Sequence, residues 1–218
     1  MIGSTACALH MALFRTLETP RLCLREPRPA DAEAVFAAYA GHAEVLRYLG
    51  WRSHASVEDT RRQLGYDTHR WLKHSAWVWM LAQREPGAPA FGQVELVPAS
   101  YPAEESHALR LGYVMGEALR GQGLMSEAVH AVLVHAFDRL QPVWRIEALC
   151  DVDNPASARL LERVGMQREG RVRRGVVHPN LSAEPRDAWL YALTRGDPLP
   201  CPAAPASATP RAGAAQSR

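Results

Sequence analysis

One stretch, from Leu109 to Val129, constrains the fold of this chain more than any other. Its first seven residues place Leu, Leu, Tyr and Met in alternation with Arg, Gly and Val, a period-2 pattern typical of a half-buried β-strand. A glycine-bearing turn follows at Gly121 and Gly123, and an apolar run of helical length comes after it. This order predicts a strand, a tight loop and a helix whose first backbone N–H groups point at one place.

A loop of this kind is suited to bind phosphate. The dipole of a helix places about half a positive charge at its N-terminus, and the free N–H groups there bind phosphate or pyrophosphate. Glycine lets an anion approach the backbone because it has no side chain. The loop lacks the Gly-Lys-Ser/Thr ending of nucleotide-triphosphate loops, and its glycine spacing does not fit the dinucleotide fingerprint. A tight turn with structural glycines is the simpler alternative.

A second motif lies downstream at residues 154–166 and reads Asn-Pro-Ala-Ser-Ala-Arg-Leu-Leu-Glu-Arg-Val-Gly-Met. The two motifs together resemble the acetyl-coenzyme A signature of the GNAT superfamily of N-acetyltransferases. Within it they resemble the RimJ/RimL type, the ribosomal-protein N-terminal acetyltransferases. In that family a loop written Gln/Arg-x-x-Gly-x-Gly/Ala holds the cofactor pyrophosphate. Arg120 and Gly123 fit this pattern, whereas Met125 departs from its final small residue.

The resemblance covers about residues 20–194 and implies the GNAT fold. This is an α/β (α+β) architecture with a mixed central β-sheet, helices on both faces and one splayed strand pair. The splay is expected between residues 113–115 and 147–150. Residue patterns predict strands at 19–25, 76–83, 91–97, 109–115, 144–150, 166–172 and 186–193. They predict helices at 32–40, 43–49, 56–73, 123–140 and 155–165.

Length and composition indicate one globular domain. The chain has 218 residues, of which 47% are hydrophobic, which suffices for a sizeable core. We expect an acetyltransferase domain at 18–195, preceded by an extension at 1–17 without the features of a signal peptide. Residues 196–218 are rich in Pro and Ala and are expected to be a disordered tail.

The net charge and the spacing of the cysteines indicate which classes of ligand and partner to expect. The formal net charge is +2, which does not favour nucleic acid as a ligand. No apolar run reaches the roughly 20 residues that a membrane span requires, so no membrane association is expected. The four cysteines are scattered without metal-type spacing, which favours reduced thiols in a cytoplasmic protein and predicts no metal site. Dimerisation is common in the resembling family and leaves a homodimer open.

The resemblance implies an enzyme that uses acetyl-CoA as cosubstrate and transfers its acetyl group to an amine by direct attack in a ternary complex. The backbone N–H of Val114 or Met115 would stabilise the oxyanion, and Asn154 would bind the pantetheine arm. In the RimJ/RimL type the serine of Asn-x-x-Ser serves the leaving thiolate, and Ser157 is the matching residue. Leu161 stands where many family members place a tyrosine acid. The pyrophosphate would lie on backbone amides of Leu119, Arg120, Gly121, Gln122, Gly123, Leu124 and Met125.

The two motifs do not identify the general base or the residues that bind the acceptor. Glu95 lies on the strand before the central one and Glu147 on the strand across the splay, and either is a candidate base or water-holding residue. A water relay is an equal alternative. Tyr48 and Trp51 are candidate acceptor contacts, because their region borders the acceptor cleft in the resembling enzymes.

Two functions of different class follow from these residues. The first is an N-acetyltransferase whose acceptor is a protein N-terminus or a small-molecule amine, such as an aminoglycoside or a polyamine. The second is a non-catalytic module that binds or senses acyl-CoA on the same fold. The undefined general base and the replacement of the tyrosine acid by Leu161 favour this alternative.

Overall fold

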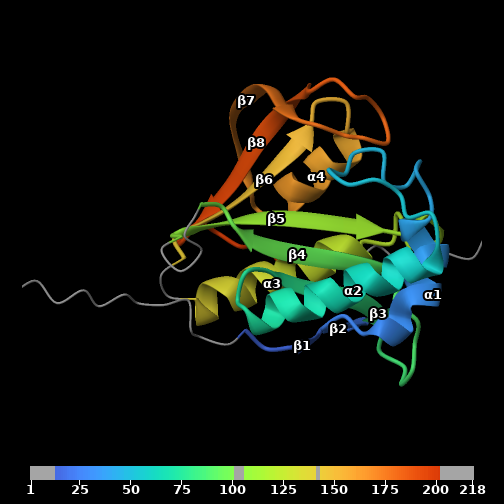
Figure 1. The fold of residues 1–218 in the computed structure, drawn as a ribbon. Coiled ribbons are helices and arrows are strands. Elements are labelled where there is room, and N and C mark those ends of the chain that lie inside the picture. The colour runs from blue at the N-terminus through green and yellow to red at the C-terminus, as the bar shows by residue number, and fades with distance from the viewer. Residues whose placement is uncertain (1–12, 101–105, 141–142, 202–218) are drawn as a thin grey trace, which may run out of the picture.

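The computed structural model describes residues 13–100, 106–140 and 143–201. Its eight strands form one mixed sheet in the order β1-β2-β3-β4-β5-β6-β8-β7 (Figure 1). All neighbouring pairs are antiparallel except β5 and β6. The strands are β1 Thr16–Glu18, β2 Leu22–Arg25, β3 Trp77–Gln83, β4 Gly92–Pro98, β5 Ala108–Met115, β6 Arg145–Asp151, β7 Gln167–Val176 and β8 Arg186–Thr194. The helices are α1 Ala32–Val35, α2 Val57–Leu72, α3 Leu124–Arg139 and α4 Pro155–Arg163.

Helices cover both faces of this sheet (Figure 1). On one face, α1 and α2 pack in a buried cluster that includes Tyr39, Leu64 and Met80. On the other face, α3 and α4 pack in a larger cluster that includes Trp79 and Leu109. The structure therefore has the predicted mixed sheet with helices on both faces.

The two long helices form where their sequences predict them. Ser56 caps α2 by accepting a hydrogen bond from the Asp59 amide at 3.2 Å, as expected for serine before a helix. Helix α3 buries ten of its sixteen residues, which explains why its sequence is apolar on most sides. Its N-terminus lies at the end of β5, so that the predicted strand, loop and helix are all present.

The first predicted strand, 19–25, is only partly correct. The structure has a tight hairpin instead, in which β1 and β2 are joined by a turn at residues 19–21. Pro20 has no amide hydrogen to give to a strand ladder, and the hydroxyl oxygen of Thr19 accepts the Leu22 amide at 2.9 Å. The turn residues therefore lie outside both strands.

The predicted helix at 43–49 is wrong, because this segment consists of hydrogen-bonded turns. The Leu46 carbonyl, which would accept a bond four residues on in a helix, accepts one from Asn180 Nδ2 at 3.1 Å. The same Asn180 amide donates to the Trp51 carbonyl at 2.7 Å. The Leu46 carbonyl therefore accepts this distant bond from Asn180 together with a turn bond from the Leu49 N–H at 2.9 Å, in place of the helical bond.

The described part of the C-terminal segment packs on the domain. Leu199 contacts the larger hydrophobic cluster, and Pro198 and Pro200 lie beside Gly165, whose φ is +91°. Contacts with the core therefore extend beyond Arg195, the expected domain boundary. The rest of the predicted tail, 202–218, and residues 1–12 of the predicted extension lie outside the described residues. Within the described ranges, no helix is both long and apolar enough to cross a membrane.

Candidate functional site

The sheet opens where β5 and β6 separate. These parallel strands pair at three positions, the last of which joins Arg110 to Glu147. Both strands continue beyond that pair, β5 to Met115 and β6 to Asp151. This separation is the predicted splay. A cavity of about 640 Å³ lies there, a size typical of small-molecule sites.

Two glycines shape the loop at one wall of this cavity. Gly121 has a φ of +79° and Gly123 a φ of +74°, a left-handed conformation that favours glycine. Gly123 is the N-cap of α3, and no atom lies within 4 Å of the place where a Cβ of Gly121 would be. The loop thus presents open backbone at the N-terminus of a buried helix. Arg120, Leu124 and Met125 line the cavity together with these glycines.

Two other loop residues lie away from the cavity wall. Leu119 packs against the larger hydrophobic cluster. The carbonyl of Gln122 accepts a hydrogen bond from Arg21 Nη1 at 2.8 Å, which ties the loop to the β1–β2 hairpin. Arg120 is held in place by Glu117 at 3.2 Å and by the Met115 carbonyl at 3.3 Å.

The hydrogen-bond ladder decides which amides of β5 face the splay. In an antiparallel pair, residues that exchange both backbone bonds alternate with residues whose backbone groups point away. The bonds Gly116 N–H to Phe91 O and Ala99 N–H to Ala108 O fix this alternation between β4 and β5. Accordingly, the N–H of Val114 points to β4, whereas the N–H of Met115 points into the splay. Of the two predicted amides, Met115 has the required direction.

The second motif bridges the splay from the side of β6. Asn154 caps α4, and its Oδ1 accepts the Ser157 amide at 3.2 Å. The Ser157 hydroxyl lies 2.7 Å from the hydroxyl of Tyr113 on β5. Burial raises the pKa of Tyr113 well above its ordinary value, which keeps its hydroxyl protonated. The pair therefore offers two connected hydroxyl groups inside the cavity wall.

Tyr113 carries no motif of its own, and the sequence does not single it out. The available signal is the alternation on β5, which places Tyr113 on the same face as Leu111 and Met115. Its partner Ser157 is 44 residues away in the sequence. The contact depends on how α4 returns to the sheet, which the sequence pattern does not specify.

The two predicted carboxylates do not line the cavity. Glu147 forms ion pairs with Arg110 at 2.9 Å and with Arg145 at 3.3 Å. Glu95 lies on the α2 face of the sheet, where Arg70 contacts it at 2.7 Å. Its carboxylate is nevertheless close to the cavity, since a Cβ on Gly112 would lie 3.9 Å from Glu95 Oε2 and Gly112 lines the wall.

A different carboxylate, Asp151, reaches the cavity wall at the end of β6. Its side chain is fully buried and accepts two hydrogen bonds from Arg186, at 2.7 and 3.1 Å. Burial alone would raise the pKa of Asp151, but the bonds from Arg186 and from the Asp153 amide lower it. Asp151 is therefore a charged anchor between β6 and β8 rather than a proton acceptor.

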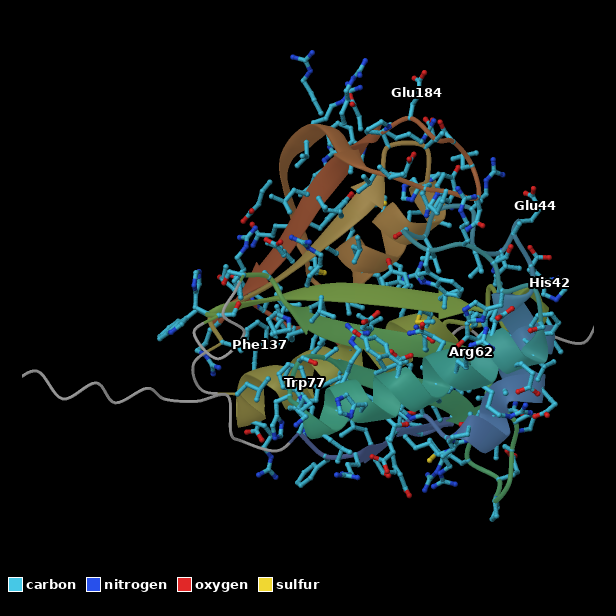
Figure 2. The ribbon with its side chains drawn as sticks, in the orientation of Figure 1. His42, Glu44, Arg62, Trp77, Phe137 and Glu184 are labelled. Atoms are coloured by element: carbon cyan, nitrogen blue, oxygen red, sulfur yellow. The ribbon has the colours of Figure 1, made fainter. Side chains whose placement is uncertain are left out.

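Two loops meet at one end of the splay, and Glu44 and Glu184 mark them in Figure 2. Tyr48, on the first loop, lines the cavity and donates a hydrogen bond to the Asp153 carbonyl at 3.0 Å. Its ring meets that of His178, on the second loop, edge to face at 5.8 Å. The predicted acceptor contact Tyr48 thus lies at the cavity.

Trp51, the other predicted acceptor contact, lines a second pocket of about 270 Å³ on the α2 face of the sheet. We call it the Arg70 pocket. Its lining includes Arg70, Asp67, Glu95, Gln93, Tyr39 and Trp51. The structure therefore brings Glu95 and Trp51 together in a pocket other than the cavity at the splay, although Glu95 adjoins the cavity wall at Gly112.

Comparison with known proteins identifies related sequences. Residues 21–167 match the family model described as an acetyltransferase (GNAT) domain. An uncharacterized N-acetyltransferase of Bacillus subtilis strain 168, YoaA, is 29% identical over 187 residues, covering 84% of this chain and 98% of that protein. The ribosomal protein uS5-alanine N-acetyltransferase of Escherichia coli strain K12 is 36% identical over 193 residues, covering 84% of this chain and 93% of that protein.

Solved structures have the same fold. A GNAT-family acetyltransferase from Bacillus anthracis superposes with a TM-score of 0.68 at 26% identity, over 82% of this chain and 98% of that one. The microcin C7 self-immunity acetyltransferase MccE, in complex with acetyl-CoA and AMP, superposes with a TM-score of 0.72 at 16% identity, over 84% and 99%. The chain is thus similar in sequence to N-acetyltransferases and in fold to a protein that binds acetyl-CoA.

Proposed function

Since this chain belongs to the GNAT acetyltransferase family and is an acetyl-CoA-dependent N-acetyltransferase, we propose that its acceptor is the α-amino group at a protein N-terminus. The observation that carries this proposal is the 36% identity, over most of both chains, to an enzyme named for an alanine of ribosomal protein uS5. The family match and the names of the relatives do not favour a non-catalytic acyl-CoA module.

The cavity at the splay fits the cosubstrate. Acetyl-CoA supplies an activated acetyl thioester. We assign the backbone amides around Gly121 and Gly123 to its pyrophosphate, because open left-handed backbone at a helix N-terminus attracts phosphate. Arg120 adds positive charge at the same wall. Asn154, at the opposite wall, is assigned to the pantetheine arm.

The backbone of β5 would stabilise charge during transfer. The acetyl oxygen becomes negative as the amine attacks, and an N–H group aimed at it lowers the barrier by a few kcal/mol. Met115 has an N–H that points into the splay, and its strand is fixed on the other side by β4. We therefore assign this role to Met115 and not to Val114.

The two hydroxyls of Ser157 and Tyr113 would receive the departing thiolate. Ser157 lines the cavity, and Tyr113 can donate a hydrogen bond to it at 2.7 Å. Hydroxyls that stay protonated at neutral pH can donate hydrogen bonds to the leaving thiolate and stabilise its negative charge. This pair takes the place of the tyrosine that Leu161 replaces.

The amine must lose a proton, and a carboxylate near the cavity has to accept it. Glu147 is held by two arginines, and Asp151 is held by Arg186. Glu95 has one arginine partner and adjoins Gly112 at the cavity wall. We propose that a water between the amine and Glu95 carries the proton away.

The test measures thiol release from acetyl-CoA with a panel of N-terminal peptides, aminoglycosides and polyamines. We expect release with peptides, and mass spectrometry should place the acetyl group on the α-amine. Release with aminoglycosides or polyamines but with no peptide would overturn the proposed acceptor.

Gly123→Glu tests the assigned loop, because a side chain there is strained and its charge repels phosphate. Calorimetry should detect no binding of acetyl-CoA to this variant. Gly65→Ala, on the exposed side of α2 with open space around it, is the matched control and should bind normally. Full binding by a folded Gly123→Glu protein would sink the assignment.

A further inference from the structure

The Arg70 pocket contains buried charges that the proposed transfer reaction does not fully use. Arg70 lies between Asp67, at 3.1 Å, and Glu95, at 2.7 Å. The Asp67 side chain is 4% exposed, that of Arg70 19% and that of Glu95 26%. Two carboxylates thus share one guanidinium in a place partly screened from water. When both are ionised, the group has a net charge of −1.

The other basic residues that line this pocket, Arg52 and His54, form no ion pair with these two carboxylates in the described structure. Arg52 directs its guanidinium to the Pro179 carbonyl, at 3.3 Å. His54 places Nδ1 at 2.8 Å from the Thr60 hydroxyl, and burial lowers the pKa of its imidazole, so that it is neutral at pH 7. Asp67 itself receives one further hydrogen bond, from Gln63 at 3.1 Å. Among the described residues, Arg70 is therefore the one cation that pairs with Asp67 and Glu95, and this cluster has one carboxylate more than it has guanidinium groups.

The Arg70 pocket and the cavity at the splay are neighbours on either side of β5. Glu95 and Gln93 lie opposite Gly112 and Val114 in the register of β4 and β5, and both of these β5 residues line the cavity. One loop also borders both spaces, since residues 44, 45 and 47–49 line the cavity and residues 51, 52 and 54 line the pocket. An acceptor lying along this loop can place its amine at one space and a side chain in the other.

We propose that the Arg70 pocket binds a basic side chain, lysine or arginine, from the first three residues of the acceptor, and so selects N-terminal segments that carry a positive charge near their end. This inference rests on the proposed function and adds the chemistry of the acceptor to it. A basic side chain supplies the missing charge, and its alkyl stem can lie against Tyr39, Val35 and Leu64. Acidic side chains are repelled from the same place.

The experiment measures kcat/KM of the full chain for short peptides that differ at one position. Lysine, norleucine or glutamate is placed at the first, second or third position of an otherwise uncharged peptide. Norleucine matches the alkyl stem of lysine without its charge. At one of the three positions we expect lysine to exceed norleucine by about fivefold or more at low salt, mainly through a lower KM. Glutamate should be the poorest substrate of the three.

Two variants should shift this preference in opposite directions. Asp67→Asn removes one carboxylate and should abolish the advantage of lysine over norleucine. Arg70→Gln removes the shared cation and should enlarge it above about pH 8, because at lower pH the loss of the guanidinium also raises the pKa of Asp67. Binding of acetyl-CoA, measured in parallel, should stay unchanged in Asp67→Asn, which shows that the cavity at the splay is intact.

Equal kcat/KM for lysine and norleucine at all three positions would overturn the proposal, as would a lysine preference that both variants retain unchanged. Either result leaves acetylation of peptide α-amines in place. Failure of every peptide to react would instead refute the proposed function. The two failures are therefore distinguishable.

Discussion

Asp67 is a carboxyl group whose surroundings oppose its charge. Burial, together with the charge of Glu95, raises its pKa to about 6, although bonds from Gln63 and Arg70 act in the other direction. The folded protein therefore holds the Asp67 proton more tightly than the unfolded chain does. The stability that this site contributes is complete below about pH 4 and is lost as the pH rises through about 6.

Asp67→Asn should show this linkage directly. Asparagine stays neutral, so the free energy of unfolding of the variant should gain about 3 kcal/mol on that of the wild type between about pH 4 and pH 7. Urea unfolding of both proteins across this range measures the difference, in which the titration of all other groups cancels. A difference that does not change with pH would mean that Asp67 titrates at its ordinary value.

Ser157 and Tyr113 permit a second test at the scale of residues. Ser157→Ala removes the hydroxyl that we assign to the departing thiolate and should lower kcat about a hundredfold, with little change in the KM for acetyl-CoA. Tyr113→Phe should have a smaller effect, because the Ser157 hydroxyl remains. Steady-state kinetics checks both. Tyr66→Phe, on an exposed position of α2, is the control for loss of a tyrosine hydroxyl.

At the scale of elements, the loop between α1 and α2 depends on a residue far away in the sequence. Asn180 donates to the carbonyls of Leu46 and Trp51, and its Oδ1 accepts the Ser53 amide at 3.0 Å. These bonds hold the loop that borders both the cavity and the Arg70 pocket. The conformation of the loop is therefore a property of its contact with the β7–β8 connection.

Asn180→Ala should release this loop. We expect the KM for an acceptor peptide to rise about tenfold, because three hydrogen bonds that order the acceptor side are lost. The affinity for acetyl-CoA, whose pyrophosphate is assigned to the α3 loop, should change much less. Ser182→Ala, in the same connection, is the control, because its hydroxyl accepts only from the Glu184 amide. An unchanged peptide KM in Asn180→Ala would contradict this view of the loop.

The sequence predicts local elements well and distant contacts poorly. The run from Leu109 to Val129 specifies strand, turn and helix through its own period and its glycines, so this part of the site is predictable. The segment 43–49 has helical composition, but its Leu46 carbonyl accepts bonds from the Asn180 side chain and from the Leu49 amide in place of the helical bond. Similarly, Glu95 was recognisable as a strand carboxylate, whereas its partner Arg70 lies on another element and becomes visible only in the fold.

At the scale of the whole molecule, the C-terminal segment closes the domain. Arg195 donates to the carbonyls of Phe137, Leu140 and Val143 and thereby satisfies the end of α3. Beyond it, Leu199 covers part of the larger hydrophobic cluster. The glycine at 165 lets this segment approach, since a Cβ there would lie 2.7 Å from the Pro198 carbonyl.

A chain that ends at Asp197 should therefore be less stable. We expect a loss of about 1–2 kcal/mol in the free energy of unfolding, because Leu199 is partly buried against the core. A chain that ends at Cys201 keeps these described contacts and is the control. Equal stability of the two chains in urea unfolding would show that the packing of Leu199 contributes nothing.

The splay should also affect the rates at which backbone amides exchange hydrogen with water. Along β5, the amides of residues 112 and 114 are engaged by β4, while those of 113 and 115 lie beyond the last pair with β6 and face the open side. Exchange rates should therefore alternate from residue to residue along one strand, slow and fast in turn. Acetyl-CoA would occupy the position of the missing neighbouring strand. Its binding should slow exchange at the amides on the open side, which removes the alternation and makes the two halves of the sheet exchange alike.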